Sequence, residues 1–512
     1  MSGTDVAAPA PPLILAGVRL PGADAPVDVH VAGGTVRAVA PAGSSPVASV
    51  ADATSGAERL ELDGRWIVPG LWDRHVHMAQ WAMAARRIDL AGVTSAADAA
   101  DLVAASVRDG AAEVIGMGYR DGLWPDRQRI DLLDAAAGDV PVVLVSGDLH
   151  SCWVDTAAAR RHGLLDRAGE SGVLREEDCF RLVRELDDVA DDVLDVWVSD
   201  AARAAAARGV VGIVDYEMRW NRDDWARRAA AGFDALRVRF GVYTQHLDRA
   251  AESGLRTGDA VEGTGGLVRV GGYKVITDGS LNTRTAWCVD PYPGLGPGEH
   301  PYGVANVPYD ELVPHLRHAR RIGLDPAVHA IGDRANERAL DALEAVQPSG
   351  WHGRAAIEHA QLLRRDDIAR FARLGVVASV QPEHAMDDRD IAERHWAGRT
   401  DRAFMLRDLA EAGVELALGS DAPVATLDPW VAIAAAVGRT RDGREPWHPE
   451  QAVDVRIALA ASTDRAGTEV REALTADLAV VDRDPYAAAA DELRGMPVAL
   501  TLIGGRVTHD GR

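Results

Sequence analysis

The chain has 512 residues, a length that suits about two to four domains or one large barrel with insertions. Hydrophobic residues make up 47% and charged residues 26%, which is typical of a folded globular protein. The formal net charge of −23 argues against nucleic acid and anionic membranes as partners, because phosphate groups would be repelled.

Cysteine usage and the lack of long apolar runs favour a cytoplasmic location. Cys152, Cys179 and Cys288 show no C-x-x-C spacing, so neither a disulfide framework nor a thiolate zinc site is expected. The first apolar stretch, 6–18, contains prolines and has no preceding basic residue, which argues against a signal peptide. No run reaches the roughly 18 apolar residues of a membrane span.

The two ends of the chain carry similar patterns of short strands. Residues 1–12 form an Ala- and Pro-rich tail that we expect to be disordered. Short alternating runs follow in 13–66, and a similar pattern returns in 461–512. Because strands need edge partners, we expect both segments to pair in one small β-sandwich domain that is split between the termini.

The segment between them, 67–460, alternates short apolar runs with helical stretches, which is typical of βα units around a parallel sheet. The candidate strands lie at 67–73, 210–215, 236–242, 271–276, 324–329, 355–359, 375–380 and 414–419. Eight such repeats predict a (β/α)8 barrel. Roughly 130 residues separate the first two strands, far more than the usual connection. We therefore expect a structured insertion at about 82–205.

Two histidines stand directly after the first predicted barrel strand. His75 and His77 form an H-x-H pair, and the strand period of two sends both imidazoles to the same face. The pair lies at the carboxyl end of its strand, where the active sites of such barrels are found. Taken alone, the pair fits two surface histidines equally well.

The same position recurs at the ends of later strands, with His329, His359 and Asp421. Singly, such a histidine is more often a core residue, and an Asp after Gly-Ser is more often a helix N-cap. Together with the H-x-H pair, they place four imidazoles and one carboxylate at one end of a barrel. These ligands suit one or two zinc-like divalent cations.

Lys274 occupies the matching place on the fourth predicted strand. A buried ammonium group would be repelled by divalent cations. A deprotonated amine, however, can add CO2 to become a carbamate, an anionic ligand that is able to bridge two metals. The alternative is a salt bridge between Lys274 and Asp278.

With these residues in view, the chain resembles the amidohydrolase superfamily, and within it the third amidohydrolase family, which includes N-substituted formamide deformylases. The resemblance spans nearly the whole chain and rests on PGLWDRHVHM, RIDLLDAA, SGDLHSCWVDTAAA, GGYKVITDGSLNTRTAW, HAIGDRANERALDALE, IEHAQLL, SVQPEH and LALGSDAPVATLDPW, in the family's order. It implies a split β domain, an insertion after the first barrel strand and a homodimer. The metal-site positions that it implies are His75, His77, Lys274, His329, His359 and Asp421.

The expected reaction is the hydrolysis of a non-peptide C–N bond, in an amide or an N-substituted formamide of small size, by water activated on zinc. Asp421 is the expected general base, because a carboxylate that touches both metal and water can accept a proton and return it to the amine. Lys274 joins it in the catalytic set. The candidates for substrate contact are His150, Trp124, Arg284, Gln381 and His384.

Several alternatives stay open. A lactone, carbamate or phosphotriester could replace the amide at the same metal site. The segment 290–308 is either a lid over the barrel rim or a long connection. A metal-free scaffold of the same fold is disfavoured because every ligand position is filled. The sequence has no G-x-S-x-G, P-loop, G-x-G-x-x-G or H-E-x-x-H motif, which argues against serine hydrolases and nucleotide-dependent enzymes.

Overall fold

The computed structural model describes residues 10–90, 92–119, 121, 124–146, 151–175, 177–296, 300–347, 353–464 and 467–512. Two compact units make up the chain. One combines Met1–Met78 with Ala202–Arg512, and the other is Ala79–Ala201. Most of the expected disordered tail, residues 1–9, lies outside the described residues.

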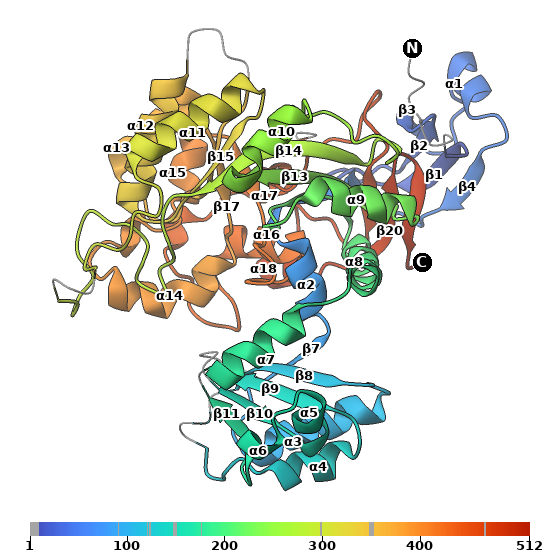
Figure 1. Ribbon diagram of the computed structural model, residues 1–512. Coiled ribbons are helices and arrows are strands. Elements are labelled where there is room, and N and C mark those ends of the chain that lie inside the picture. Colours follow the sequence, from blue (N-terminus) through green and yellow to red (C-terminus); the bar gives the residue numbers. More distant parts are fainter. Residues whose placement is uncertain are drawn as a thin grey trace. The chain divides into compact units, whose positions relative to one another are not determined.

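An eight-stranded parallel sheet forms a (β/α)8 barrel in the first unit (Figure 1). In spatial order its strands are β6 (Leu71–Val76), β12 (Val210–Asp215), β13 (Arg237–Tyr243), β14 (Val268–Ile276), β15 (Pro326–Ala330), β16 (Ala356–His359), β17 (Val377–Val380) and β18 (Leu416–Leu418). Every residue of β12 is buried, as expected of a strand with both faces covered.

Helices surround this sheet and connect its strands (Figure 1). They are α9 (Asn221–Ala230), α10 (Leu247–Glu252), α11 (Tyr309–Arg321), α12 (Asp333–Val346), α13 (Arg365–Leu374), α14 (His384–His395), α15 (Leu406–Glu411), α16 (Pro429–Gly438) and α17 (Val455–Ala461). Several carry acidic residues in their first turn, where the positive end of the helix dipole stabilises negative charge.

Backbone hydrogen bonds from the segment after β18 close the barrel against β6. The Asp421 amide donates to the carbonyl oxygen of His75 at 2.7 Å, and the His77 amide donates to that of Ala422 at 2.8 Å. At Gly419 the two segments approach so closely that an added Cβ would lie 2.6 Å from the His75 nitrogen. The closure therefore joins the two chain segments that carry candidate ligands.

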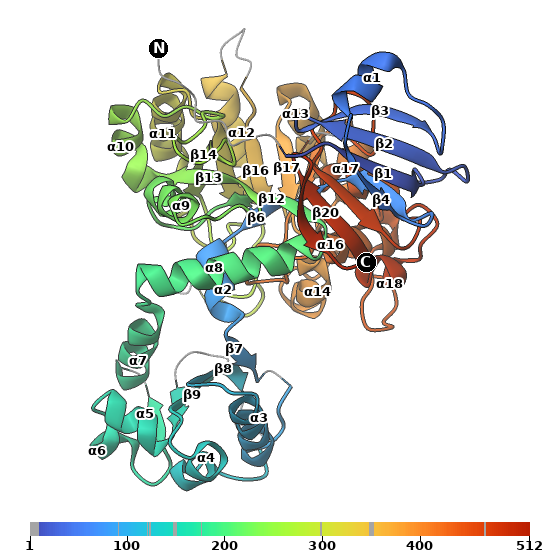
Figure 2. The same ribbon diagram turned by 90° about the vertical axis from the view of Figure 1, so that its right-hand side faces the viewer.

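A two-sheet sandwich is built from both ends of the chain (Figure 2). One sheet holds β1 (Leu13–Val18), β2 (Val27–Ala32), β3 (Thr35–Pro41) and β4 (Glu58–Glu61), with the short helix α1 (Ala48–Ala53) before β4. The other holds β5 (Trp66–Pro69), β19 (Leu478–Val481), β20 (Val498–Ile503) and β21 (Arg506–Asp510), with α18 (Ala490–Arg494) between β19 and β20. Leu15, Val29, Leu478 and Leu500 belong to one core that both sheets share.

The prediction of a single strand at 67–73 is wrong, because the chain changes sheets within it. β5 ends at Pro69 and pairs with β19 in the sandwich, whereas β6 begins at Leu71 and opens the barrel. Gly70 lies between them, and an added Cβ there would stand 2.3 Å from a methyl group of Val211. Only glycine lets the chain pass this close to β12.

The second unit, Ala79–Ala201, has a five-stranded mixed sheet of its own. Its strands are β7 (Arg87–Asp89), β8 (Val114–Tyr119), β9 (Val142–Ser146), β10 (Ser151–Val154) and β11 (Val173–Arg175). Its helices are α3 (Ala96–Arg108), α4 (Ile130–Ala137), α5 (Thr156–Arg161), α6 (Leu165–Ala168) and α7 (Glu177–Asp187). The boundaries of the unit in the sequence fall within α2 (Met78–Ala84) and within α8 (Asp191–Ala206). Val103, Leu133 and Leu144 lie in its core, so this segment buries apolar surface by itself.

The cysteines and the described helices bear on the expectations about disulfides and membrane spans. All three cysteines are buried as thiols. Among the described helices, none combines the length and the apolar character that crossing a membrane requires.

We predict that Gly419→Ala destabilises the protein. The added methyl group would overlap the β6 backbone, and overpacking of this kind costs about 1–3 kcal/mol of unfolding free energy. Urea denaturation of the full chain measures the change. Gly495→Ala is the matched control, because the nearest atom to its added Cβ is 3.8 Å away. Equal stability of the two variants would contradict the close approach.

Candidate active site

Four histidines and one aspartate converge at the carboxyl ends of the barrel strands. Ligand atoms of His75, His359 and Asp421 lie within 4.8 Å of one another. His75 Nε2 and His77 Nε2 are 3.5 and 3.4 Å from Asp421 Oδ1. The ring centres of His329 and His359 are 4.4 Å apart. Side chains from β6, β15, β16 and the segment after β18 therefore share one centre.

Two of these side chains stand on left-handed backbone. His359, the last residue of β16, has a φ of 74°, and Asp421 has a φ of 56°. For residues other than glycine such backbone costs about 1–3 kcal/mol, and it persists only where the surroundings hold it in place. The hydrogen bond from the Asp421 amide to His75 supplies such a constraint. Strain is thus concentrated where the candidate ligands meet.

Lys274 lies in the barrel interior on β14 and is 2% exposed. Its Nζ stands 4.4 Å from the centre of the Tyr216 ring and has no hydrogen-bond partner among the described residues. Burial lowers the pKa of Lys274 to about 8, although the charges of Glu358 and Asp421 oppose this shift. A larger share of the amine is therefore neutral near pH 8 than in an exposed lysine.

Asp278 does not pair with Lys274 in the described part of the chain, so the alternative of a salt bridge between them is not realised. Its buried carboxylate instead accepts hydrogen bonds from the backbone amides of Trp287, Ile331 and Gly332, at 2.8, 3.0 and 2.9 Å. Burial raises the pKa of Asp278 to about 7, against these hydrogen bonds. The residue ties the segment after β14 to the end of β15.

Glu358 connects three strands inside the barrel, and the sequence analysis missed it. This carboxylate, 1% exposed, accepts hydrogen bonds from His75 Nδ1 at 2.7 Å, Tyr216 at 2.9 Å and Ser379 at 2.5 Å. Burial would raise its pKa, but the charges of His75 and Lys274 and the hydrogen bonds hold it at about 2. A carboxylate can only accept here, so His75 carries its proton on Nδ1 and turns the lone pair of Nε2 toward the candidate ligands.

The histidines that converge are held mostly neutral. Burial lowers the pKa of His75, brings that of His329 to about 3 and takes that of His359 well below its usual value. His77 differs, because its hydrogen bond to Asp421 outweighs burial and raises its pKa. Burial would also raise the pKa of Asp421, but the charge of His75 and the hydrogen bond of His77 keep it well below its usual value.

This set of donors fits a divalent cation. Lys274 Nζ, His329 Nε2 and His359 Nδ1 are buried and have no hydrogen-bond partner within the described ranges. Buried polar atoms without partners are rare in proteins, and a metal ion is one group that satisfies them. Neutral imidazoles and an ionised carboxylate, without a thiolate, are the ligand forms that zinc-like cations bind.

Two of the predicted substrate-contact residues follow β17 on the same side of the barrel. His384 Nε2 lies 3.9 Å from Asp421 Oδ2, and its ring stacks on that of His359 with the centres 6.4 Å apart. Gln381 is 1% exposed, and its Nε2 has no hydrogen-bond partner among described residues. His384 therefore borders the converging ligands directly.

Of the other three candidates, two lie within the described residues. Arg284 is half-buried on the segment after β14, where its charge adds to burial in lowering the pKa of His395. Trp124 belongs to the Ala79–Ala201 unit and packs against Tyr119 and Trp153, with ring centres 5.4 and 6.5 Å apart. His150 lies outside the described residues.

The segment 290–308 is tied down at several points outside its undescribed residues 297–299. The Tyr292 amide donates to the carbonyl of Pro301 at 2.6 Å, and the Cys288 amide donates to that of Tyr302 at 2.8 Å. Arg399 donates to the carbonyl of Asp290 at 2.9 Å. These contacts favour a fixed connection over a lid.

The chain matches a protein-family model and is similar to several known proteins. A model of the amidohydrolase family matches residues 59–509. YtcJ of Bacillus subtilis (strain 168), which carries the name of an amidohydrolase, is 26% identical over 495 residues, covering 88% of this chain and 90% of that protein. The N-substituted formamide deformylase of Arthrobacter pascens is 30% identical over 205 residues, 38% of each chain.

Solved structures show the same fold. An uncharacterized metal-dependent hydrolase from Pyrococcus horikoshii OT3 superposes with a TM-score of 0.75 at 24% identity, covering 94% of this chain and 99% of that one. The family match extends over most of the chain, from the sandwich through the barrel and back to the sandwich. The chain therefore belongs to the amidohydrolase family, whose members are metal-dependent hydrolases.

Proposed function

We propose that this protein hydrolyses a C–N bond other than a peptide bond, in a small amide or N-substituted formamide. The observation that carries the proposal is the buried convergence of His75, His359 and Asp421, with His77, His329 and Lys274 around them. The partial similarity to an N-substituted formamide deformylase supports the choice of bond. We further propose a cytoplasmic homodimer.

Zinc is the proposed metal, with one or two ions per chain. His75, His77, His329, His359 and Asp421 would hold it. Lys274 would join them as a carbamate, since its neutral Nζ can add CO2 with loss of one proton. A metal bound to these residues would lower the pKa of a bound water toward about 7 and would polarise the substrate carbonyl.

The chain's own residues then have separate tasks. Asp421 accepts the proton of the attacking water and returns it to the nitrogen of the leaving amine, so that a carboxylate and an amine are released. Glu358 keeps His75 in the tautomer that offers Nε2 as a ligand. His384, beside Asp421, is placed to hydrogen-bond the substrate. His150, Trp124, Arg284 and Gln381 stay predictions for substrate contact.

We predict that the purified protein contains one or two divalent ions per chain and hydrolyses members of a panel of N-formyl and N-acyl amines. Elemental analysis and product assays measure both quantities in one sample. Removal of the metal with a chelator should abolish hydrolysis, and zinc should restore it. Lactones, carbamates and phosphotriesters belong in the same panel. Turnover of lactones or phosphotriesters alone would overturn the choice of C–N bond, and turnover of carbamates alone would overturn the choice of an amide or formamide.

Asp421→Asn should slow hydrolysis by about 10² or more while much of the metal is retained, because the amide cannot accept the proton of the attacking water. The rate per bound metal, from hydrolysis and metal content of the same preparation, measures this effect. A rate equal to that of the unmodified protein would refute Asp421 as the base.

Glu358→Gln should weaken metal binding about 10- to 100-fold, because the amide no longer fixes the His75 tautomer as a carboxylate does. Competition with a chromophoric chelator gives the affinity without any assay of activity. Glu344→Gln is the control, since Glu344 pairs with Arg373 on the helical surface. If both variants bind zinc equally well, Glu358 has no positioning role.

A further inference from the structure

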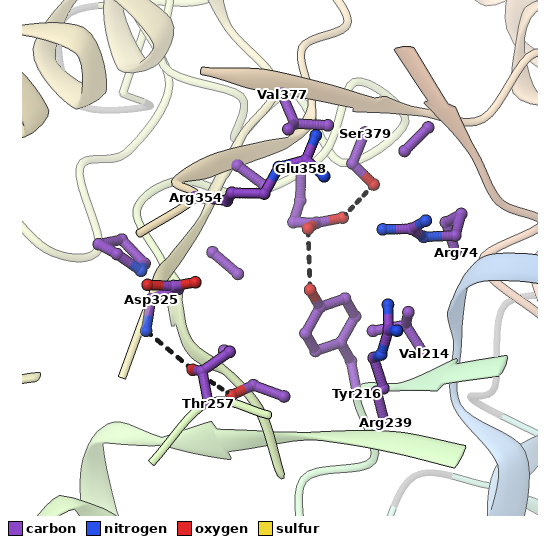
Figure 3. A pocket seen from close by; sticks show the side chains of 16 residues that line it. Arg74, Val214, Tyr216, Arg239, Thr257, Asp325, Arg354, Glu358, Val377 and Ser379 are labelled. Atoms are coloured by element: carbon purple, nitrogen blue, oxygen red, sulfur yellow. Dashed lines mark hydrogen bonds between the residues drawn. The ribbon is translucent and has the colours of Figure 1, made fainter. Parts of the chain in front are cut away.

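A cavity lies inside the barrel near the amino ends of β15, β16 and β17, and Glu358 is one of the residues that line it (Figure 3). Its volume is about 120 Å³. Pro326, Ala356 and Val377, the first residues of β15, β16 and β17, line its wall. Glu358 separates it from the candidate metal ligands, because this carboxylate lines the cavity and also binds His75.

The cavity exists because short side chains stand where such barrels are filled by branched apolar ones. Gly271, Gly272, Ala327, Ala356 and Ala417 face it from β14, β15, β16 and β18. By comparison with a protein cavity of about 150 Å³ that binds benzene, which has six non-hydrogen atoms, this cavity has room for about five. This limits a ligand to a few non-hydrogen atoms.

Two guanidinium groups face this space. Arg74, on β6, and Arg239, on β13, line the cavity and point into it (Figure 3). Both side chains are partly exposed, at 16% and 23%. Arg239 is held by Asp464 through both terminal nitrogens, at 2.6 and 2.5 Å.

Arg74 is less well supplied with hydrogen-bond acceptors than Arg239 among the described residues. Its Nη1 donates to the carbonyl of Thr463 at 3.2 Å and is 3.8 Å from Asp464, whose oxygens already bind Arg239. Its buried Nε has no hydrogen-bond acceptor among the residues the structure describes. Two neighbouring cations thus share one carboxylate, and the buried Nε of Arg74 remains without an acceptor among the described residues.

The other charged side chains that line the cavity limit the charge that a ligand can carry. The third guanidinium, that of Arg354, pairs with Glu415. Asp325 and Glu358 also line the cavity, and Glu358 already accepts three hydrogen bonds. These carboxylates would repel a multivalent anion, whereas an ion with a single charge can lie against Arg74 at the other side.

We propose that this cavity binds a small monocarboxylate, such as formate or acetate, on Arg74. A carboxylate is planar and accepts hydrogen bonds from a guanidinium group, so it can pair with the part of the Arg74 guanidinium that lines the cavity. Formate and acetate have three and four non-hydrogen atoms and fit the volume, whereas butyrate is too long. Binding here requires neither metal nor catalysis, so it is independent of the proposed hydrolysis.

The test uses the full chain after removal of metal by a chelator, so that no carboxylate can bind to a metal ion. Thermal stability is followed while formate, acetate or butyrate is titrated against chloride at constant ionic strength. Formate and acetate should stabilise the protein with saturation, and butyrate should not. Stabilisation by butyrate equal to that by acetate, or no saturation with any of them, would overturn the site.

Two variants locate the binding. Arg74→Met removes the charge and should weaken both ligands about tenfold or more, as expected for loss of hydrogen bonds to a charged group. Ala356→Val fills part of the cavity without changing any charge and should weaken acetate more than formate. Arg269→Met is the control, because Arg269 lies outside the cavity and donates to the carbonyl of Gly258. Unchanged affinity in Arg74→Met and Ala356→Val, or an equal loss in Arg269→Met, would contradict the proposal.

Discussion

The hydrogen bond between Glu358 and His75 is the interaction on which the rest of the site depends. A carboxylate that is 1% exposed is tolerated only where donors replace its water, and here the donors are His75 on β6, Ser379 on β17 and Tyr216 directly after β12. The same bonds therefore fix the position of three strands and the tautomer of one imidazole. Loss of the carboxylate would affect both the barrel interior and the candidate ligands.

The closure of the barrel constrains the position of His75 by a second hydrogen bond, in addition to the one with Glu358. His75 is held by its side chain to Glu358 and by its carbonyl oxygen to the amide of Asp421. Asp421 in turn adopts left-handed backbone, which is strained for a residue with a side chain. The strain is tolerated because Gly419 lets the end of β18 pack directly on the β6 backbone. Candidate ligands on the first and last strands are thus placed by the backbone.

The sequence predicted the barrel strands well because each one is a short apolar run that ends near a polar residue. Seven of the predicted runs overlap one barrel strand each, and only 67–73 combines two strands of different sheets. The sequence alone could not show that the chain changes sheets at Gly70, because the segment is apolar. Glycine is needed there because the backbone passes close to Val211, which lies far along the chain. Glu358 was missed for a similar reason: its three donors come from distant strands, and the one local signal was a carboxylate inside an apolar strand.

Because the interior of the barrel is polar, the apolar burial that stabilises this fold lies mainly outside the sheet. Ala327, Glu358 and Ser379 face the inside of the barrel, so strand alternation turns Val328, Ile357 and Ala378 outward. These outward residues are almost fully buried, which places them in the layer between the sheet and its helices. Because the interior holds charged side chains and a cavity, most of the apolar burial of the barrel lies in that outer layer. Changes to the strand–helix layer are therefore expected to act mainly on stability, whereas a change at an interior position such as Glu358 also acts on the candidate ligands.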